Sequence, residues 1–334
     1  MALATAWVAS AYHLPVRDPD GGVIATYIRL PLIILAAWLV DVGARAFLRN
    51  RGHLRGVPKA MVEVTRERWN RRQILFAVSG LLSWYVMYAA FRNLKSYVPF
   101  VNRNLYDADL ARLDQILFLG NDPADTLHQL FGTTWAAEFF SVIYVAWIVL
   151  VPMTLAIALM WTRASHAGAW FVTAVGVDWV LGVAVYYLVP TVGPVYSAPQ
   201  HFADLPPTFV GTLQTDMWQA RLDVLHNPWD TVAVQTIAAF ASLHVGIMVT
   251  MCLMAHLLRL PVALRVAGWI FLALTVVGTI YLGWHFVMDA FAGAAVGAAG
   301  VWIAALGTGN HVSGWPRLRA AQVEESSSRE MRSA

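Results

Sequence analysis

The sequence contains little charge and almost no cysteine. Charged residues make up 13% of the 334 positions, about half the ~25% of a soluble domain. The single cysteine, Cys252, excludes a scaffold held together by disulfides. Apolar residues reach 58%, which a water-soluble globule cannot bury and a disordered chain does not contain. The composition therefore indicates an integral membrane protein.

Seven apolar stretches are long enough for a helix that crosses about 30 Å of hydrocarbon. They are residues 29–46, 74–91, 136–161, 169–189, 232–258, 262–282 and 284–306. The first is the weakest, because it contains Pro31 and Asp41. The sequence thus predicts an all-α, polytopic transmembrane bundle. Residues 74–306 would form a six-span core, and residues 1–73 would supply one additional span and a basic loop.

The distribution of lysine and arginine predicts the orientation. Residues 45–72, two short turns and the tail after residue 306 would together place 16 of the 23 basic residues on one side. That side should be the cytoplasm, so we expect a multi-pass plasma-membrane protein with a cytoplasmic C-terminus. We interpret the basic loop as a solvated segment near anionic headgroups and expect no nucleic-acid partner. Residues 307–334 are predicted to be a disordered tail.

Two long segments should then lie on the outer face. Residues 93–135 carry apolar side chains at helical spacing among acidic ones, including Asp107, Asp109 and Asp114, which is typical of an amphipathic helix at the interface. Residues 190–231 are rich in proline and aromatic residues. So long a loop outside a bundle is usually functional, and we expect it to be a lid.

Ionisable residues inside predicted spans are costly, so each requires a reason. One group contains Ser242 and His244, near the outer end of the fifth predicted span. The other runs from Tyr281 to His285 and Asp289, at the outer start of the seventh. The chain between the two histidines can cross the membrane, turn and return. Both imidazoles should therefore arrive at the same face.

These residue types together could carry out covalent transfer. His285 and Asp289 are at i and i+4, so a carboxylate can fix the tautomer of one imidazole and leave its other nitrogen as a nucleophile. His244 could act as a general acid. The residues predicted to bind an anionic substrate are Ser242, at a helix start, Tyr281, and the cations Arg92 and Lys95.

Other polar or small residues receive a structural interpretation or none. Asp41 and Asp178 have no partner that the sequence identifies, and His256, near the cytoplasmic end, is interpreted as structural. The glycines at 293, 297 and 300 should permit close helix packing. The excess of tryptophan and tyrosine is mostly typical of an interfacial belt.

The sequence Ser242-Leu243-His244 followed by His285-xxx-Asp289 resembles the type 2 phosphatidic acid phosphatase superfamily. It is most similar to the branch that contains inositol phosphorylceramide synthases. Further support comes from residues 91–95, from an acidic run between Asp107 and Pro123, and from residues 187–194. The resemblance covers residues 74–306, which correspond to the helical core of that superfamily.

The resemblance implies metal-independent phosphoryl transfer through a phosphohistidine, with no cofactor. His285 would attack phosphorus, Asp289 would orient it, and His244 would protonate the departing oxygen. Arg92 and Lys95 would bind phosphate, with Ser242 assisting. The chain departs from the family pattern at three points. Residues 278–279 are Gly-Thr in place of a Ser-Arg pair, and residue 241 is alanine in place of proline. The Lys-x6-Arg-Pro motif of the family is absent from the sequence. The residues that could replace the missing arginine are Arg92, Lys95, Arg103, Arg112 and Arg221.

The sequence thus predicts a membrane phosphatase or phosphotransferase that acts on a lipid-linked phosphate from the outer face. The group transferred would be of the inositol-phosphate type. Two alternatives remain open at this stage. A proton-coupled transporter would use Asp178, Asp289 and His285 as a relay, and a haem protein would use His244 and His285 as ligands.

Overall fold

The computed structural model describes residues 1–19, 26–51, 53–161, 165–232 and 234–318, and these are mainly helical. The helices are α1 (Ala2–Ala11), α2 (Thr26–Arg49), α3 (Val57–Arg68), α4 (Arg71–Val101), α5 (Asp107–Leu117), α6 (Pro123–Phe131), α7 (Trp135–Ala156), η1 (Ile157–Trp161), α8 (Ser165–Leu188), α9 (Pro194–Ser197), η2 (Pro199–Phe202), α10 (Phe209–His226), α11 (Leu243–Leu257), α12 (Val262–Tyr281) and α13 (Val287–Gly307). A two-stranded hairpin follows, β1 (His311–Val312) and β2 (Trp315–Pro316).

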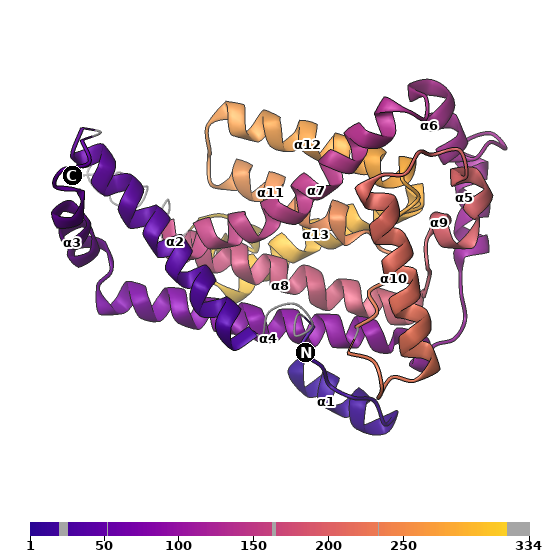
Figure 1. Ribbon diagram of the computed structural model, residues 1–334, viewed down its shortest axis with the longest axis horizontal. Coiled ribbons are helices and arrows are strands. Elements are labelled where there is room, and N and C mark those ends of the chain that lie inside the picture. The colour runs from indigo at the N-terminus through magenta and orange to yellow at the C-terminus, as the bar shows by residue number, and fades with distance from the viewer. Residues whose placement is uncertain (20–25, 52, 162–164, 233, 319–334) are drawn as a thin grey trace.

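Among the described residues, five helices are long and apolar enough to cross a membrane, and they belong to α4, α7, α8, α12 and α13. The prediction of an all-α polytopic bundle is therefore confirmed, and the chain is a multi-pass membrane protein. In Figure 1 these helices and α11 form one bundle, with α5, α6, α9 and α10 gathered at one end, here called the lid end. The helices α2 and α3 lie at the opposite end, here called the basic end (Figure 1).

Several predicted boundaries differ from the structure. The stretch 232–258 becomes a helix only from Leu243, because the hydroxyl of Ser242 caps α11 and the residues before it are not helical. The predicted lid loop, residues 190–231, is largely helical, since it contains α9, η2 and the 18-residue α10. The stretch 29–46 lies within α2, which is not among the five long apolar helices. The predicted disordered tail begins with the hairpin, and residues 319–334 lie outside the described part of the chain.

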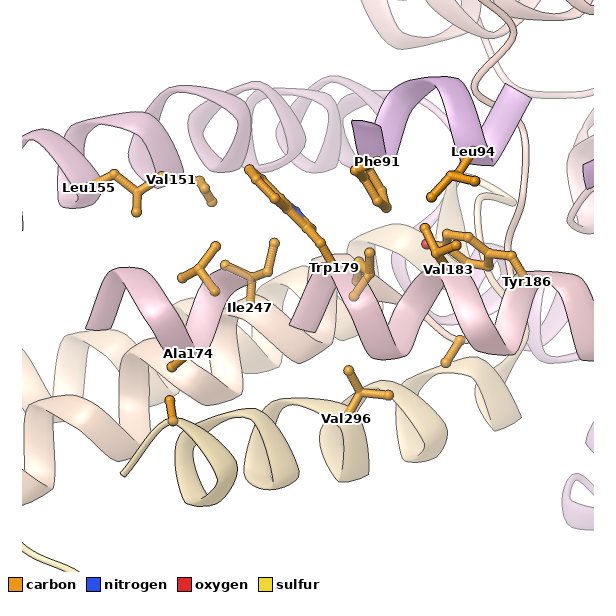
Figure 2. Packing of buried hydrophobic residues seen from close by; sticks show 14 of the residues in the cluster. Phe91, Leu94, Val151, Leu155, Ala174, Trp179, Val183, Tyr186, Ile247 and Val296 are labelled. Carbon is orange, nitrogen blue, oxygen red and sulfur yellow. The ribbon is translucent and has the colours of Figure 1, made fainter. Parts of the chain in front are cut away.

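The centre of the bundle is packed with large side chains from different helices. Trp179 of α8 stacks on Phe91 of α4 with ring centroids 5.5 Å apart. Figure 2 shows these two residues within a cluster that also takes Val151 from α7, Ile247 from α11 and Val296 from α13. This core fixes the relative positions of the helices that carry the candidate site.

Glycines bring α11 and α13 into backbone contact. A Cβ at Gly297 would lie 2.1 Å from the carbonyl oxygen of Gly246, and one at Gly293 would lie 2.2 Å from that of Ser242. Small residues permit this approach in membrane helices. The close packing expected at these positions is therefore present, and it places the start of α11 against the start of α13.

The isolated polar residues of the sequence have partners in the structure. The hydroxyl of Thr250 donates to Asp178 at 2.7 Å. Asp41 accepts hydrogen bonds from the side chains of Arg45, Arg68 and Trp69. His256 Nε2 accepts a hydrogen bond from Trp269 Nε1 at 2.9 Å.

Candidate active site

The two histidines meet at the lid end of the bundle. His244 is the second residue of α11, and His285 lies in the short segment between α12 and α13. The distance from His244 Nδ1 to His285 Nε2 is 2.8 Å. Residues 41 positions apart in the sequence thus share one hydrogen bond, as the alternation of spans predicted.

Asp289 fixes the orientation of His285 from the first turn of α13. Its Oδ2 lies 3.0 Å from His285 Nδ1 and also accepts the Phe286 amide at 3.0 Å. Because Oδ2 already accepts an amide N–H, we assign it as the acceptor towards His285 as well, which places the proton of His285 on Nδ1 and a lone pair on Nε2. The Nδ1–H of His244 then donates to that lone pair. The arrangement is a chain from Asp289 through His285 to His244.

Both imidazoles line a cavity of about 630 Å³. Its polar end also contains Arg92 and Lys95, both from α4. From there the cavity continues between α4, α7, α8 and α11 along apolar and aromatic side chains, which include Trp84, Tyr88, Val151, Pro152, Trp179 and Ile247. The cavity is therefore amphipathic, with charge and imidazole at one end and an apolar arm at the other.

The two cations of the cavity are held by aromatic rings. The ammonium of Lys95 lies 4.8 Å from the ring centroid of Tyr186, and Arg92 donates to the hydroxyl of Tyr88 at 3.2 Å. Within the described residues, no carboxylate lies within ion-pair distance of either cation. Their charges are therefore available to an anion in the cavity.

Aromatic side chains enclose His244. Trp147 donates from Nε1 to the carbonyl oxygen of His244 at 3.1 Å, and the two rings are 4.4 Å apart. Tyr144 lies 5.2 Å from the His244 ring and stacks on Trp284. These contacts differ from the sequence-based expectation, which assigned most of the tryptophan and tyrosine residues to an interfacial belt. The signal in the sequence is the spacing of three residues between Tyr144 and Trp147, which puts both side chains on one face of a helix.

The acidic helix α5 braces the walls of the cavity with two buried carboxylates. Asp107 accepts the amides of Val192 and Gly193 at 3.1 Å and 2.8 Å. Asp114, two helical turns further on, accepts the amides of Val287 and Met288 at 2.7 Å and 3.1 Å. These are the first two residues of α13. The helix expected at the interface is thus a brace for the segments on either side of the histidines.

Burial changes the pKa of both carboxyl groups. It raises the pKa of Asp114 to about 6, against the opposing effect of the two amide hydrogen bonds. It also raises the pKa of Asp107, which the amides of Val192 and Gly193 oppose. A buried carboxylate is disfavoured unless donors surround it. Asp114 is therefore a group whose charge changes within the range of an activity assay.

Two of the predicted substrate-binding residues lie outside the residues that line the cavity. The hydroxyl oxygen of Ser242 is buried and accepts the Val245 amide at 3.3 Å as the cap of α11. Tyr281 is fully buried and donates its hydroxyl hydrogen to the carbonyl oxygen of Gly132 at 2.7 Å. The structure thus brings together His244, His285 and Asp289, with Arg92 and Lys95 in the same cavity.

The donor groups do not fit a haem between the two histidines. Metal–imidazole bonds of about 2 Å on either side of an ion would hold the two nitrogens about 4 Å apart, whereas they are 2.8 Å apart. A different trio, Asp122, Asp125 and His201, places its ligand atoms within 4.8 Å of one another at the lid end. Asp122 caps α6 and His201 pairs with Asp125, so these groups are used within the protein.

The fold and the site together define a class, a polytopic helical membrane protein with a paired-histidine cavity. The sequence profile of the PAP2 superfamily matches residues 108–303. This is more than half of the chain, which therefore belongs to the PAP2 superfamily. Membership indicates a phosphatase-type activity on lipid phosphates. Neither curated proteins nor solved structures gave a match to the chain.

Proposed function

We propose that the protein is a metal-independent membrane phosphatase or phosphotransferase that works through a phosphohistidine at His285. One observation carries the proposal. The Nε2 of His285, whose Nδ1 contacts Asp289, lies 2.8 Å from the ring of a second histidine, in a cavity that also contains Arg92 and Lys95, neither of which pairs with a carboxylate of the described residues. A nucleophile, an orienting carboxylate and an acid are the components of covalent group transfer.

The reaction would proceed in two displacements. A bound phosphate would separate the two imidazoles, and His285 Nε2 would attack phosphorus. The bond from phosphorus to the leaving oxygen would break, and His244, in its protonated form, would give a proton to that oxygen. In the second step, the oxygen of water or an alcohol would attack phosphorus, the bond from phosphorus to His285 Nε2 would break, and the proton of the attacking group would pass to His244. Arg92 and Lys95 would stabilise the charge that develops on the phosphoryl oxygens.

The shape of the cavity supports a lipid as the phosphate donor. The polar end accommodates a phosphate, and the arm past Trp84, Val151 and Trp179 is apolar and lies between helices that span the membrane. A hydrocarbon chain placed there would leave its phosphate beside the histidines. A water-soluble phosphate would leave the apolar arm without a partner, so it fits the cavity less well.

Hydrolysis and transfer differ only in the group that attacks the phosphoenzyme. Leu213 and Met217 of α10 line the cavity at the lid end, where they would limit the entry of water. Together with the resemblance to inositol phosphorylceramide synthases, this cover favours transfer to an alcohol. We therefore infer an acceptor alcohol and a transferred group of the inositol-phosphate type.

The lid end would face the outside of the plasma membrane. The basic residues 45–72 lie mainly in α2, α3 and the start of α4, at the opposite end (Figure 1), which supports a cytoplasmic location for that end. The C-terminal hairpin also lies towards the basic end (Figure 1). A reporter fused to the C-terminus that fluoresces only in the cytoplasm should be active. Activity of a reporter that requires export would reverse this orientation.

The experiment that tests the mechanism is to trap the intermediate. Protein in detergent would be incubated with a ³²P-labelled lipid phosphate and quenched in alkali. We expect a base-stable, acid-labile label on the wild type and none on His285→Ala. His256→Ala is the matched control, because this histidine lies at the other end of α11, and it should label normally.

The same variants would be compared for turnover of a membrane lipid extract, with mass spectrometry to detect changed headgroups. His285→Ala and His244→Ala should abolish turnover, and chelation by EDTA should leave it unchanged. Label on His285→Ala, or turnover in both variants, would place the reaction elsewhere. Loss of activity with EDTA would refute a metal-independent mechanism.

A further inference from the structure

A second cavity, of about 320 Å³, lies at the lid end next to the histidine cavity. It is lined by the end of α4, the segment that follows it, and α10, and its polar side chains include Asn102, Arg103, Thr191 and Arg221. Thr191 faces this cavity, whereas the adjacent Val192 lines the histidine cavity. One short segment therefore separates the two spaces.

Arg221 is buried in the wall of this second cavity with few partners. The residue is only 8% exposed to solvent. One guanidinium nitrogen donates to Gln235 Oε1 at the long distance of 3.4 Å. That oxygen also accepts the Ile237 amide at 2.9 Å. A guanidinium has five N–H donors, so most of the hydrogen-bonding capacity of Arg221 is unused by the described residues.

The charge of Arg221 is not neutralised by a direct ion pair. Within the parts of the chain that the structure describes, no carboxylate lies within 4.0 Å of its nitrogens. Asp107 attracts it from a greater distance, but the oxygens of Asp107 accept the amides of Val192 and Gly193. Burial lowers the pKa of Arg221, and Asp107 only opposes this effect. A buried cation of this kind is costly unless an anion joins it.

Arg103 supplies a second cation at the exposed side of the same cavity. Its side chain is exposed and has no hydrogen-bond or ion-pair partner among the described residues. A phosphate group is well matched to guanidinium groups, because each can form two parallel hydrogen bonds with its oxygens. The volume is at the lower end of the range for small-molecule sites, about 300–1,000 Å³.

We propose that this second cavity binds a phosphate-bearing group, distinct from the phosphate that reacts at His285. Arg221 would hold the buried side of the group and Arg103 the exposed side. The apolar residues Val98, Phe100 and Leu225, which line the rest of the cavity, would accommodate the less polar part of the same molecule. The ligand is thus a phosphate monoester or diester, either soluble or as a lipid headgroup. The proposal does not depend on catalysis.

Binding would be measured by equilibrium dialysis of ³²P-labelled inorganic phosphate against the full-length protein in detergent. The double variant Lys95→Gln/His285→Ala serves as the background, because it weakens phosphate binding in the histidine cavity. We expect the background to retain one phosphate site. Adding Arg221→Gln or Arg103→Gln should each weaken that site at least tenfold.

The matched control is Arg112→Gln, which removes the same charge from the exposed surface of α5 without lining either cavity. It should leave the affinity within twofold. Because Arg221 is buried, thermal unfolding of Arg221→Gln must first show a folded protein. If it is not folded, Arg103→Gln, at an exposed position, decides alone. Loss of all phosphate binding in the background, or an unchanged affinity in a folded arginine variant, would overturn the proposal.

The two sources of phosphate would be separated in lipid nanodiscs. Displacement of labelled phosphate by phosphatidylglycerol, but not by phosphatidylcholine alone, would support a lipid headgroup, provided that Arg103→Gln abolishes the effect. If phosphatidylglycerol leaves the labelled phosphate bound but glycerol phosphate displaces it, the ligand is a soluble ester. Displacement by neither compound would contradict a site for phosphate esters. Because binding is read without turnover, failure here leaves the phosphohistidine mechanism untouched.

Discussion

Removing the carboxylate of Asp114 should affect both stability and catalysis. In the wild type its two oxygens accept the amides of Val287 and Met288 at 2.7 Å and 3.1 Å, and the side chain is almost fully buried. Asp114→Ala leaves both amides without a partner at the start of α13. Each donor left unsatisfied on burial costs about 1–3 kcal/mol, so for the two amides we expect a total loss of about 2–6 kcal/mol in the free energy of unfolding.

The same change should lower kcat more than it raises KM. The freed amides directly follow the segment that carries His285, and Asp289 lies in the same helical turn. A displacement of about 1 Å in a catalytic group can cost about 100-fold in rate. We therefore expect kcat to fall about 10- to 100-fold. KM should change little, because Arg92 and Lys95 lie on α4.

The assays are thermal unfolding in detergent and turnover of a lipid phosphate. Asp109→Ala is the matched control, because Asp109 lies on the same helix with its side chain exposed. It should match the wild type in both measurements. An Asp114→Ala protein with wild-type melting temperature and kcat would refute the idea that α5 braces the site. A loss of stability with full kcat would limit its role to folding.

Three further predictions concern the same region. The pKa of Asp114, about 6, lies above its ordinary value, so the folded state binds this proton more tightly than the unfolded state. Lowering the pH from 8 to 5 should therefore raise the melting temperature of the wild type relative to that of Asp114→Asn. A difference in melting temperature that stays constant with pH would contradict the raised pKa. Asp289→Asn should reduce kcat about 10⁴-fold by losing the tautomer control, and a near-normal kcat would exclude that role. Gly297→Ala should lower the melting temperature, because its Cβ would meet the Gly246 carbonyl oxygen at 2.1 Å, whereas Gly307→Ala, which meets nothing within 4 Å, should not; equal melting temperatures would show that α11 and α13 can separate at little cost.

The meeting of the two histidines could be predicted because it depends only on topology. Spans alternate in direction, so His244 and His285, separated by one descent and one return, must reach the same end. The i to i+4 relation of His285 and Asp289 likewise needs only helical geometry. The cations Arg92 and Lys95 follow from their place at the end of the second predicted span.

The remainder of the site depends on contacts that hydropathy does not encode. Nothing in the pattern distinguishes Trp147, which contacts His244, from an aromatic residue at the membrane interface. The polar faces of α5 and of a surface helix are alike in sequence, although Asp107 and Asp114 are buried against backbone amides. The largely apolar residues 232–242 continue the hydropathy of α11 in the N-terminal direction, but the helix begins only after Ser242, which caps its N-terminus. The first two outcomes follow from tertiary hydrogen bonds, and the third follows from the local cap that Ser242 forms on the Val245 amide.

The position of the catalytic loop is set from the lid end as much as from the bundle. The side chain of Gln214, on α10, donates to the carbonyl oxygen of Leu282 at 2.7 Å. The amide of Val195 donates to the carbonyl oxygen of Gly283 at 2.9 Å. Asp114 then accepts the first amides of α13, on the other side of the loop. Three segments outside the spans therefore hold successive parts of the loop that carries His285, the proposed nucleophile. In the proposed reaction, a movement of α10 that admits an acceptor must break or carry with it the hydrogen bond to Leu282, so access to the proposed phosphoenzyme and the placement of His285 would be mechanically linked.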